Sequence, residues 1–374
     1  MKIRDAQLQH RFNVVGDSGV WTFNVNLVDP VTEFKIWVFA KVSEHDALAD
    51  QCLPYCISEI ALIDGSEVIQ AMTGAEAIAL YMFDHGKAPM HWHQELTSMS
   101  NYWCIPMTFG RHLTDPEYIF DPTKFRNPQI RITWNLSAVT AVGTAGSWLE
   151  DAVAGGGLQI SVWAKVMEEG ATPKGYLMAK ELKEFTSPAS GQEITYLPTD
   201  FDIRKLLIRA YKNCGDMTDA ITNIKISQDE DKWIPVDLLS ADFIFLHYDW
   251  FDEMEFDLKV CRDDLENDEH FGGQYSHGVG IGAENDAIVN LRGWASNCFA
   301  TDAHGHDGAT KDNVQLWVRT FTRTPFDTFC YPFGDQMRRE DWLKVAPIGN
   351  LRLILTMGAA DYTTQVWVQQ IHPY

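Results

Sequence analysis

Apolar and polar residues alternate in short runs along the whole chain. In residues 21–27 and 130–134 every second side chain is apolar or aromatic, as in Ile130-Arg-Ile-Thr-Trp134. Side chains on a β-strand point to opposite faces in turn, so this period of two predicts strands with one buried face. Similar runs, rich in β-branched and aromatic residues, occupy residues 34–39, 160–166, 207–211, 316–321, 351–355 and 365–369. The pattern therefore predicts a β-rich protein.

Helical spacing of apolar residues is rare. The best candidate helix covers residues 73–83, and Gly86 stands where a glycine often ends a helix. A second short helix is expected over residues 237–245. Parallel folds need a helix between successive strands, so the shortage of helices favours antiparallel sheets.

The apolar pattern indicates that one unit occurs twice in the chain. Residues 57–83 overlay on residues 221–247 without gaps at an offset of 164, and both segments read as two strands followed by a short helix. Four further pairs of segments keep the same order: 34–39 with 206–211, 105–110 with 329–334, 129–133 with 350–354, and 160–163 with 364–367. Solenoid and propeller repeats are only about 20 to 50 residues long, so we infer the duplication of a whole domain.

Length and local composition predict two domains of similar size. A chain of 374 residues corresponds to roughly two domains of typical length. Residues 186–202 are rich in Ser, Pro and Gly, which is typical of a connection between domains. We therefore expect an N-terminal domain over residues 1–194 and a C-terminal domain over residues 195–374. Many short strands with irregular connections in each half predict an all-β fold of two tandem eight-stranded jelly rolls with a few short helices.

Charge and cysteine content exclude several classes of protein. The formal net charge is −22 and Lys and Arg form no cluster, so direct binding of nucleic acid is not expected. Seven cysteines, an odd number, argue against a fully paired disulfide framework, so we expect reduced thiols and synthesis in a cytoplasm. We find no signal-peptide pattern and no run of about 18 apolar residues, so neither export by that route nor a membrane span is expected.

Two histidine pairs are candidate metal ligands. His91 and His93 would share one face of a strand, with Glu95 as a third ligand. His304 and His306 lie between two Asp residues in a glycine-containing segment, which resembles a cation-binding loop or a cupin site. The first pair has no distant partner motif, and the second half lacks the further His and carboxylate that a cupin needs. We therefore predict neither a metal nor another cofactor.

The other acidic and glycine-rich segments do not match a known ion-binding or phosphate-binding motif. Residues 229–231 and 263–270 lack the Asp spacing of an EF-hand, so we expect solvated loops, with ions between neighbouring copies as the alternative. Residues 249–253 mix aromatic and acidic residues as sugar-cleaving sites do, but the sequence does not give the separation of two carboxylates. Residues 272–282 are glycine-rich without a preceding strand and following helix, so we expect a long loop and no phosphate site. No nucleophile-elbow, P-loop or C-x-x-C motif occurs, and no catalytic residue is predicted.

Several segments give the chain a family resemblance. Ile63-Asp-Gly-Ser-Glu67 precedes the first expected helix, and Phe109-Gly-Arg111 is followed by Phe120-Asp-Pro-Thr-Lys-Phe-Arg-Asn-Pro128. The sequence ends in Val368-Gln-Gln-Ile-His-Pro-Tyr374. Together with the duplicated β pattern in both halves, these segments resemble the double jelly-roll major capsid proteins of tailless icosahedral phages and related large DNA viruses.

The resemblance implies a structural protein and not an enzyme. Subunits would form homotrimers in which six jelly rolls make a pseudo-hexameric capsomer, and capsomers would build an icosahedral virion shell, with insertions between strands forming towers. The expected partners are further copies of the chain, vertex or penton proteins and minor capsid proteins, and contact with an internal membrane stays open. The rival interpretations are a carbohydrate-binding tandem β-sandwich, in a receptor-binding or glycan-processing protein, and a cupin-like metalloenzyme that uses one histidine pair.

Overall fold

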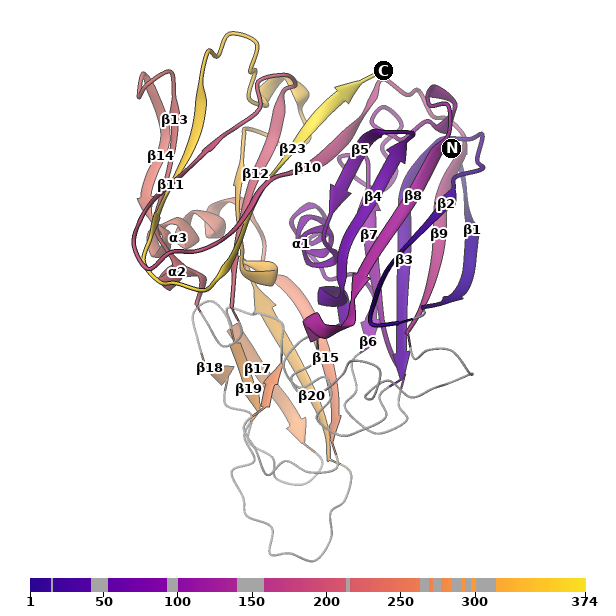
Figure 1. Cartoon of the computed structure of the whole chain (residues 1–374), viewed down its shortest axis with the longest axis horizontal. Coiled ribbons are helices and arrows are strands. Elements are labelled where there is room, and N and C mark those ends of the chain that lie inside the picture. The colour runs from indigo at the N-terminus through magenta and orange to yellow at the C-terminus, as the bar shows by residue number, and fades with distance from the viewer. Residues whose placement is uncertain are drawn as a thin grey trace, which may run out of the picture.

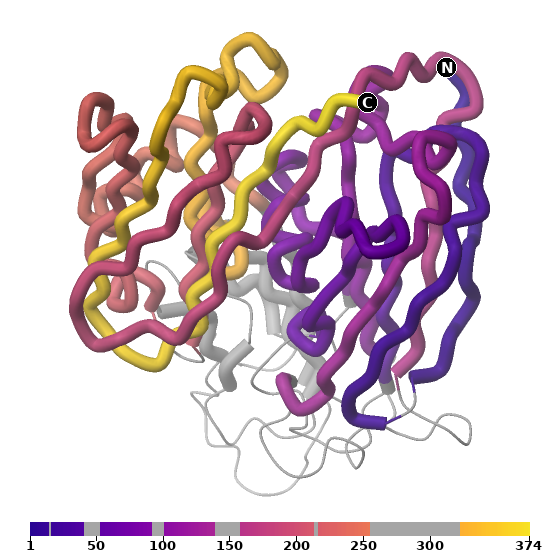
Figure 2. Tube along the Cα trace, turned by 45° about the horizontal axis from the view of Figure 1, so that its top comes forward, coloured from indigo at the N-terminus to yellow at the C-terminus, as the bar shows by residue number. Residues whose placement is uncertain are grey.

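The protein consists of two β-rich units that lie side by side in the computed structural model (Figure 1). The structure describes residues 1–14, 16–41, 53–92, 100–139, 158–212, 216–262, 269–271, 277–283, 291–292, 297–300 and 314–374. Strands dominate these residues and helices are few, so the predicted all-β fold is confirmed. Figure 2 shows the same two units from a second direction, with the early part of the chain in one and the late part in the other.

In the first unit, two antiparallel sheets face each other across a core. One sheet has the strand order β1-β9-β3-β7-β6, and the other has the order β2-β8-β4-β5. In β3, Phe34, Ile36 and Val38 all point into this core, so the alternating pattern of the sequence marks the buried face. The strands are β1 Lys2–Asn13, β2 Ser18–Asn24, β3 Val31–Lys41, β4 Ile57–Asp64, β5 Glu67–Met72, β6 His91–Trp92, β7 Ser100–Thr108, β8 Pro128–Asn135 and β9 Leu158–Glu169.

The second unit contains two sheets of the same kind around a core of its own. One has the order β10-β23-β12-β21, and the other has the order β11-β22-β13-β14. Leu206 and Ile208 of β12 belong to this second core, whereas Leu207 between them belongs to the core of the first unit. The strands are β10 Gly175–Thr186, β11 Gly191–Tyr196, β12 Ile203–Tyr211, β13 Ile221–Gln228, β14 Trp233–Leu239, β21 Thr328–Pro332, β22 Leu351–Met357 and β23 Thr363–Pro373.

The two units repeat one strand order, which confirms the duplication. Strands β1, β9, β3 and β7 correspond to β10, β23, β12 and β21, and strands β2, β8, β4 and β5 correspond to β11, β22, β13 and β14. The segment pairs matched in the sequence fall on these corresponding strands. The ungapped overlay of residues 57–83 on residues 221–247 holds only for β4 and β13, because the turn after β13 is two residues longer than the turn after β4. Strands β4 and β13 begin 164 residues apart, at Ile57 and Ile221, whereas the helices that follow begin 166 apart, at Gly74 and Ser240.

A helix follows β5 in the first unit, and a corresponding helix follows β14 in the second. Helix α1 (Gly74–His85) is capped by Thr73, whose hydroxyl accepts a hydrogen bond from the Glu76 N–H, and it ends at Gly86 as predicted. The second predicted helix is displaced: β14 continues to Leu239 and α3 runs over Ser240–Trp250, because β14 pairs with β13 along this stretch. The shorter helices are α2 Met217–Ala220, η1 Leu53–Cys56, η2 Pro122–Lys124, η3 Leu136–Val139, η5 Pro325–Asp327 and η6 Arg339–Asp341.

An additional group of strands is inserted between α3 and β21. Strands β15, β20 and β17 form one antiparallel sheet, and β16, β19 and β18 form another. In Figure 1, β15 and β20 extend away from the two units, on the side opposite to the chain termini. The strands are β15 Met254–Arg262, β16 Glu269–Phe271, β17 His277–Ala283, β18 Leu291–Arg292, β19 Asn297–Ala300 and β20 Val314–Thr322.

The segment that was expected to connect the domains and the glycine-rich segment that was expected to be a loop both contain strands. Residues 186–202 include β11, which pairs with β22 from Gly191 to Tyr196, so this segment is not a simple linker. Within residues 272–282, the part from His277 onward belongs to β17 and pairs with β20, while residues 272–276 lie outside the described residues. The backbone N–H and C=O groups make these pairs, so segments rich in Ser and Gly can also form strands, which their composition does not indicate.

Candidate functional site

The two units meet at a buried surface. At their edges, Ala71 of β5 and Lys180 of β10 form a parallel bridge that joins the sheets of the two units. Beside this edge, the outward face of β12 and β23 packs against the first unit, and Leu207 and Trp367 on that face are fully buried. Helix α1 contacts η5 of the second unit. Burial of this apolar area holds the units together.

A buried charge cluster crosses the interface between the units. Asp84 near the end of α1 accepts hydrogen bonds from Arg204 Nη1, at 2.8 Å, and from Lys205 Nζ. These three side chains are at most 2% exposed. Burial alone would raise the pKa of Asp84, but the two cations hold it below its ordinary value. Burial lowers the pKa of Lys205, against the opposing effect of Asp84. The ions therefore depend on each other to stay charged inside the protein.

An acidic cluster lies on the same interface. Burial, and then the neighbouring Glu181, raise the pKa of Glu76 to about 8, although the Thr73 N–H donates to its carboxylate. The pKa of Glu181 is also raised, mainly by burial. Gln365 of β23 donates to Glu181 Oε2 at 3.2 Å and accepts from Arg209 Nη1 at 2.8 Å. At neutral pH Glu76 is therefore largely protonated, and it lies in a hydrogen-bonded cluster that includes residues of both units.

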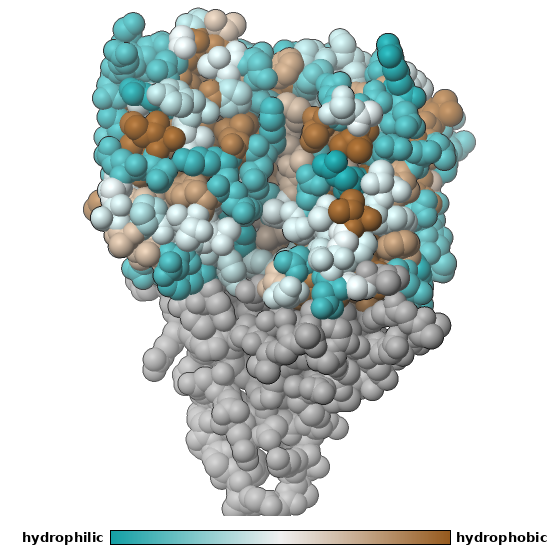
Figure 3. All heavy atoms as spheres, viewed as in Figure 1, coloured by the Kyte–Doolittle hydropathy of each residue, from teal (hydrophilic) through white to brown (hydrophobic). Residues whose placement is uncertain are grey.

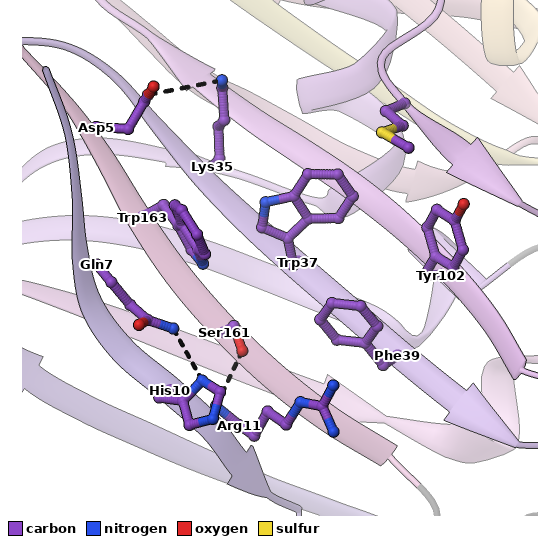
Figure 4. A pocket seen from close by; sticks show the side chains of 11 residues that line it. Asp5, Gln7, His10, Arg11, Lys35, Trp37, Phe39, Tyr102, Ser161 and Trp163 are labelled. Carbon is purple, nitrogen blue, oxygen red and sulfur yellow. Dashed lines mark hydrogen bonds and ion pairs between the residues drawn. The ribbon is translucent and has the colours of Figure 1, made fainter.

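No described strand or helix covers the face of the first unit that corresponds to β12 and β23. Trp37 and Phe39 of β3, Tyr102 of β7 and Trp163 of β9 point away from the core and line a groove of about 470 Å³ (Figure 4). Trp163 is 38% exposed, whereas Trp367, which holds the corresponding position on β23, is fully buried. We call these four residues the outer aromatic face.

Polar groups beside the outer aromatic face are paired with each other. Gln7 Nε2 and His10 Nδ1 lie 2.8 Å apart, and the Arg11 backbone N–H donates to Ser161 Oγ at 2.9 Å (Figure 4). Ligand sites usually combine an apolar wall with a few convergent polar groups. This face presents aromatic rings, and its neighbouring polar groups stabilise β1 and β9.

A second apolar surface lies on β14 and α3. Leu239 is 58% exposed, Phe245 55%, Tyr248 45%, and Trp233 at the start of β14 43%. In the corresponding helix α1, every residue over 74–83 is buried. Single exposed apolar residues are ordinary, but a group of them on two consecutive elements is typical of an interaction surface. We call these four residues the α3 surface. On the face drawn in Figure 3, by comparison, hydrophobic residues form small patches separated by polar ones.

Solved structures with the same arrangement cover the whole chain. The STIV MCP has 10% identity and a TM-score of 0.58, with 100% of this chain and 98% of that chain covered. The PBCV-1 virus capsid has 11% identity and a TM-score of 0.58, with 99% and 93% covered. The major capsid protein P2 from bacteriophage PM2 has 10% identity and a TM-score of 0.53, with 99% and 98% covered. The chain has a double jelly-roll fold. No family model and no curated protein matches the sequence.

Of the candidate histidine sites, only His91 lies in the described part of the chain. His91 lies in β6, where its Nδ1 is 2.8 Å from the Pro89 carbonyl oxygen and its ring stacks on Trp103 with centroids 4.7 Å apart. Among the described residues no group of three or more His, Cys, Asp and Glu could hold a metal ion. The other candidate ligands lie outside the described residues: His93, Glu95, His304 and His306.

The described acidic candidates serve the local structure of the second jelly roll. Residues 229–231 form the turn between β13 and β14, and Asp229 Oδ1 accepts hydrogen bonds from the backbone N–H groups of Gly349 and Asn350 at 3.0 and 2.9 Å. The acids in residues 249–253 lie at the end of α3 and just after it, and none of them lines the groove of the outer aromatic face. Residues 263–268 of the other acidic run lie outside the described residues.

Sequence analysis missed the charged residues of the interface. Thr73-x-x-Glu76 is a readable capping-box motif, but nothing in the sequence indicates that Glu76 and Asp84 are buried against a second unit. Three cysteines in the described part of the chain are free and buried: Cys56, Cys104 and Cys330. No helix in the described part of the chain is long and apolar enough to cross a membrane.

Proposed function

We propose that the chain is a structural major capsid protein that trimerises into pseudo-hexameric capsomers and assembles into an icosahedral virion shell. The observation that carries this proposal is the similarity in fold to capsid proteins, which covers 99–100% of this chain and 93–98% of those proteins. The similarity therefore extends over both jelly rolls of this chain. Three chains with two jelly rolls each supply the six similar units that a hexagonal tile requires.

The proposed partners follow from this role. They are further copies of the chain, vertex or penton proteins and minor capsid proteins, in a virion built after synthesis in a host cytoplasm. A net charge of −22 favours contacts with proteins over direct contacts with a genome. We propose a structural role and assign no catalytic residue, metal or cofactor.

We propose two domains, one for each jelly roll. The division into residues 1–194 and 195–374 stays a prediction. Strands β10 and β11 pair with β23 and β22, which belong to the second jelly roll. This pairing favours a boundary between β9 and β10, in residues 170–174, and limited proteolysis followed by mass measurement of the fragments tests both positions.

The first test is the mass of the purified protein by light scattering, followed by negative-stain imaging of the same sample. We expect a stable species of three chains of 42.4 kDa each, with a hexagonal outline, or closed shells. A protein that stays monomeric at every concentration and forms neither tiles nor shells would contradict the proposal.

A second candidate function is carbohydrate binding. The observation in its favour is the outer aromatic face, where Trp163 is 38% exposed beside a groove of about 470 Å³, because sugar rings stack on exposed tryptophans. Titration with a panel of glycans, followed by intrinsic tryptophan fluorescence, tests it. Saturable binding that is lost in Trp163→Ala would favour this function, and the absence of binding across the panel would remove it.

A further inference from the structure

His247 of α3 is the one histidine that is fully buried in the described part of the chain. Aromatic rings surround it. Phe83 of α1 and Phe329 of β21 lie with their ring centroids 5.8 and 6.4 Å from that of His247. Phe251, which directly follows α3, lies at 5.4 Å. The imidazole therefore lies where α3, a strand of the second jelly roll and α1 of the first unit meet.

Both ring nitrogens of His247 have fixed partners. Nε2 accepts a hydrogen bond from the Cys330 backbone N–H at 3.1 Å, and Nδ1 donates to the Arg323 carbonyl oxygen at 2.7 Å. A ring nitrogen that accepts from an N–H carries no proton, so His247 is neutral and its proton is on Nδ1. A second proton would turn Nε2 into a donor that faces another donor. The site therefore fits the neutral ring and not the imidazolium.

The partners of His247 lie on the chain connections of the inserted strands. Helix α3 leads through Phe251 into β15, and β20 leads through Arg323 into η5 and β21. The Arg323 carbonyl oxygen accepts from His247, and Arg323 Nη1 donates to the Phe251 carbonyl oxygen. The entry and the exit of the insertion are thus linked to each other and to α3. We call His247, with its bonds to Arg323 and Cys330, the His247 latch.

We propose that the His247 latch is sensitive to acid, and that protonation of His247 releases both connections of the inserted strands while the jelly rolls stay folded. This role goes beyond the proposed function and does not depend on the association of copies. The imidazolium has no lone pair for the Cys330 N–H, and a buried charge without a counterion is costly. Protonation therefore favours a state in which the connections leave α3 and water reaches the ring.

No described carboxylate offsets a charge on His247. Arg323 is the one charged group in the described part of the chain that acts on the pKa of His247, and it lowers this pKa further. Glu253 is 52% exposed and lies 3.6 Å from Arg323 Nη2, so it pairs with the guanidinium. Burial raises the pKa of the Cys330 thiol to about 12 and that of Asp327 in η5 well above its ordinary value, so both groups are uncharged in acid.

The other charged groups on the elements around α3 are exposed or paired with each other. On α3 itself, Asp242 and Asp249 are exposed. On α1, Asp84 pairs with Arg204 and Lys205. Strands β13 and β14 also pack on α3, and their side chains Lys225 and Asp237 lie 4.0 Å apart. Of these described groups, none acts on the pKa of His247.

The pKa of His247 sets the pH range of the latch. Burial lowers this pKa from its ordinary value of 6.5 to about 4. The open state has the ordinary pKa and binds the proton more readily, so opening becomes easier as the pH falls. The stability of the closed latch is complete above pH 6.5 and is lost as the pH falls through 4. From these values the equilibrium constant for opening rises about thirtyfold between pH 7.5 and pH 5.

Hydrogen exchange of the full-length chain at pH 7.5 and pH 5, followed by mass spectrometry, tests the proposal. The Cys330 amide donates to the His247 ring, and the Phe251 amide donates to the His247 carbonyl oxygen at 2.9 Å. After correction for the pH dependence of the chemical exchange rate, we expect the protection of both amides to fall about thirtyfold. Peptides from β8 are the internal reference, and their protection should change less than about threefold.

Variants without a titrating group at this position separate the latch from other effects of acid. The Gln side chain of His247→Gln offers one donor and one acceptor, as the neutral imidazole does, but takes up no proton. We expect the protection of the Cys330 amide to change less than about threefold between the two pH values in this variant. His247→Phe also lacks the titration and suits the aromatic surroundings. The matched control is His112→Gln, in the loop between β7 and β8, which should keep the thirtyfold change.

Three outcomes would overturn the proposal. The first is a change of less than about threefold at the Cys330 and Phe251 amides of the wild type. The second is a wild-type change that persists in either variant of His247. The third is an equal loss of protection in β8, because acid would then unfold the jelly rolls as a whole. Light scattering measures trimer formation separately, so the proposed function stands or fails independently of the latch.

Discussion

The buried charge cluster between the jelly rolls allows a sharp prediction. Asp84→Asn keeps the shape of the side chain and removes its charge, which leaves Arg204 and Lys205 buried beside a neutral amide. Arg204 and Asp84 are 2% and 1% exposed, and Lys205 is 1% exposed. Removal of one partner from such a pair costs about 3–5 kcal/mol, because the remaining charge is not compensated.

The expected loss lies at the lower end of this range. Burial already lowers the pKa of Lys205, so the lysine can release its proton in the variant and reduce the cost. We therefore expect Asp84→Asn to lower the free energy of unfolding by about 3 kcal/mol at pH 7, which is roughly a hundredfold change in the unfolding equilibrium. The deficit should shrink at higher pH, where Lys205 is more easily neutral.

In the wild type, the charge on Asp84 makes the free energy of unfolding depend on pH in the acidic range. The pKa of Asp84 in the folded protein lies below its ordinary value of 3.8. A carboxyl of this kind contributes stability above that ordinary value, and the contribution is lost as the pH falls through the folded-state pKa. The variant should lack this part of the acid destabilisation, so the two stability curves should approach each other at low pH.

Urea unfolding followed by tryptophan fluorescence measures the effect. The matched control is Glu169→Gln, which removes an exposed ion pair with Lys2 whose atoms are 3.9 Å apart and whose side chains are 67% and 63% exposed, so we expect a loss of no more than about 0.5 kcal/mol. Adding Lys205→Met to Asp84→Asn should recover part of the stability, because it removes an unpaired buried charge. A loss below about 1 kcal/mol in Asp84→Asn would refute the argument that this cluster is desolvated.

Further variants test other parts of the molecule. The pKa of Glu76 is raised to about 8, so its carboxyl favours folding at low pH and this contribution is lost as the pH rises through 8; Glu76→Gln should flatten the stability curve between pH 5 and 9. Trp367→Ala should cost about 3–5 kcal/mol of folding stability and Trp163→Ala about 1 kcal/mol or less, because the first residue is fully buried and the second 38% exposed. Gly334→Ala should destabilise the protein by about 1–3 kcal/mol, because the φ of Gly334 is +68° and a Cβ would lie 2.2 Å from the Asp341 carbonyl oxygen. Thermal unfolding measures the effects of the Trp367 and Gly334 variants, and an unchanged unfolding midpoint in either variant would contradict the prediction for that residue.

Local pattern accounts for much of the fold. The period of two located strands such as Ile130–Trp134 within β8, because a strand with one buried face must alternate. Thr73 and Gly86 delimit α1, because capping depends on neighbours within one turn. The second helix began later than predicted and β11 was missed, since both depend on pairing with strands distant in the sequence.

The internal repeat in the sequence predicted the duplication, but it did not predict that corresponding residues of the two units differ in burial. Ser161-Val-Trp163 and Gln365-Val-Trp367 are nearly the same in sequence, lie on corresponding strands and have the same alternation. Trp367 is nevertheless fully buried and Trp163 is 38% exposed. The sequence determined that both rings point away from their own core. Only the tertiary structure decided which ring is covered, because the first unit lies against the face that contains Trp367, whereas no described part of the second unit lies against the face that contains Trp163.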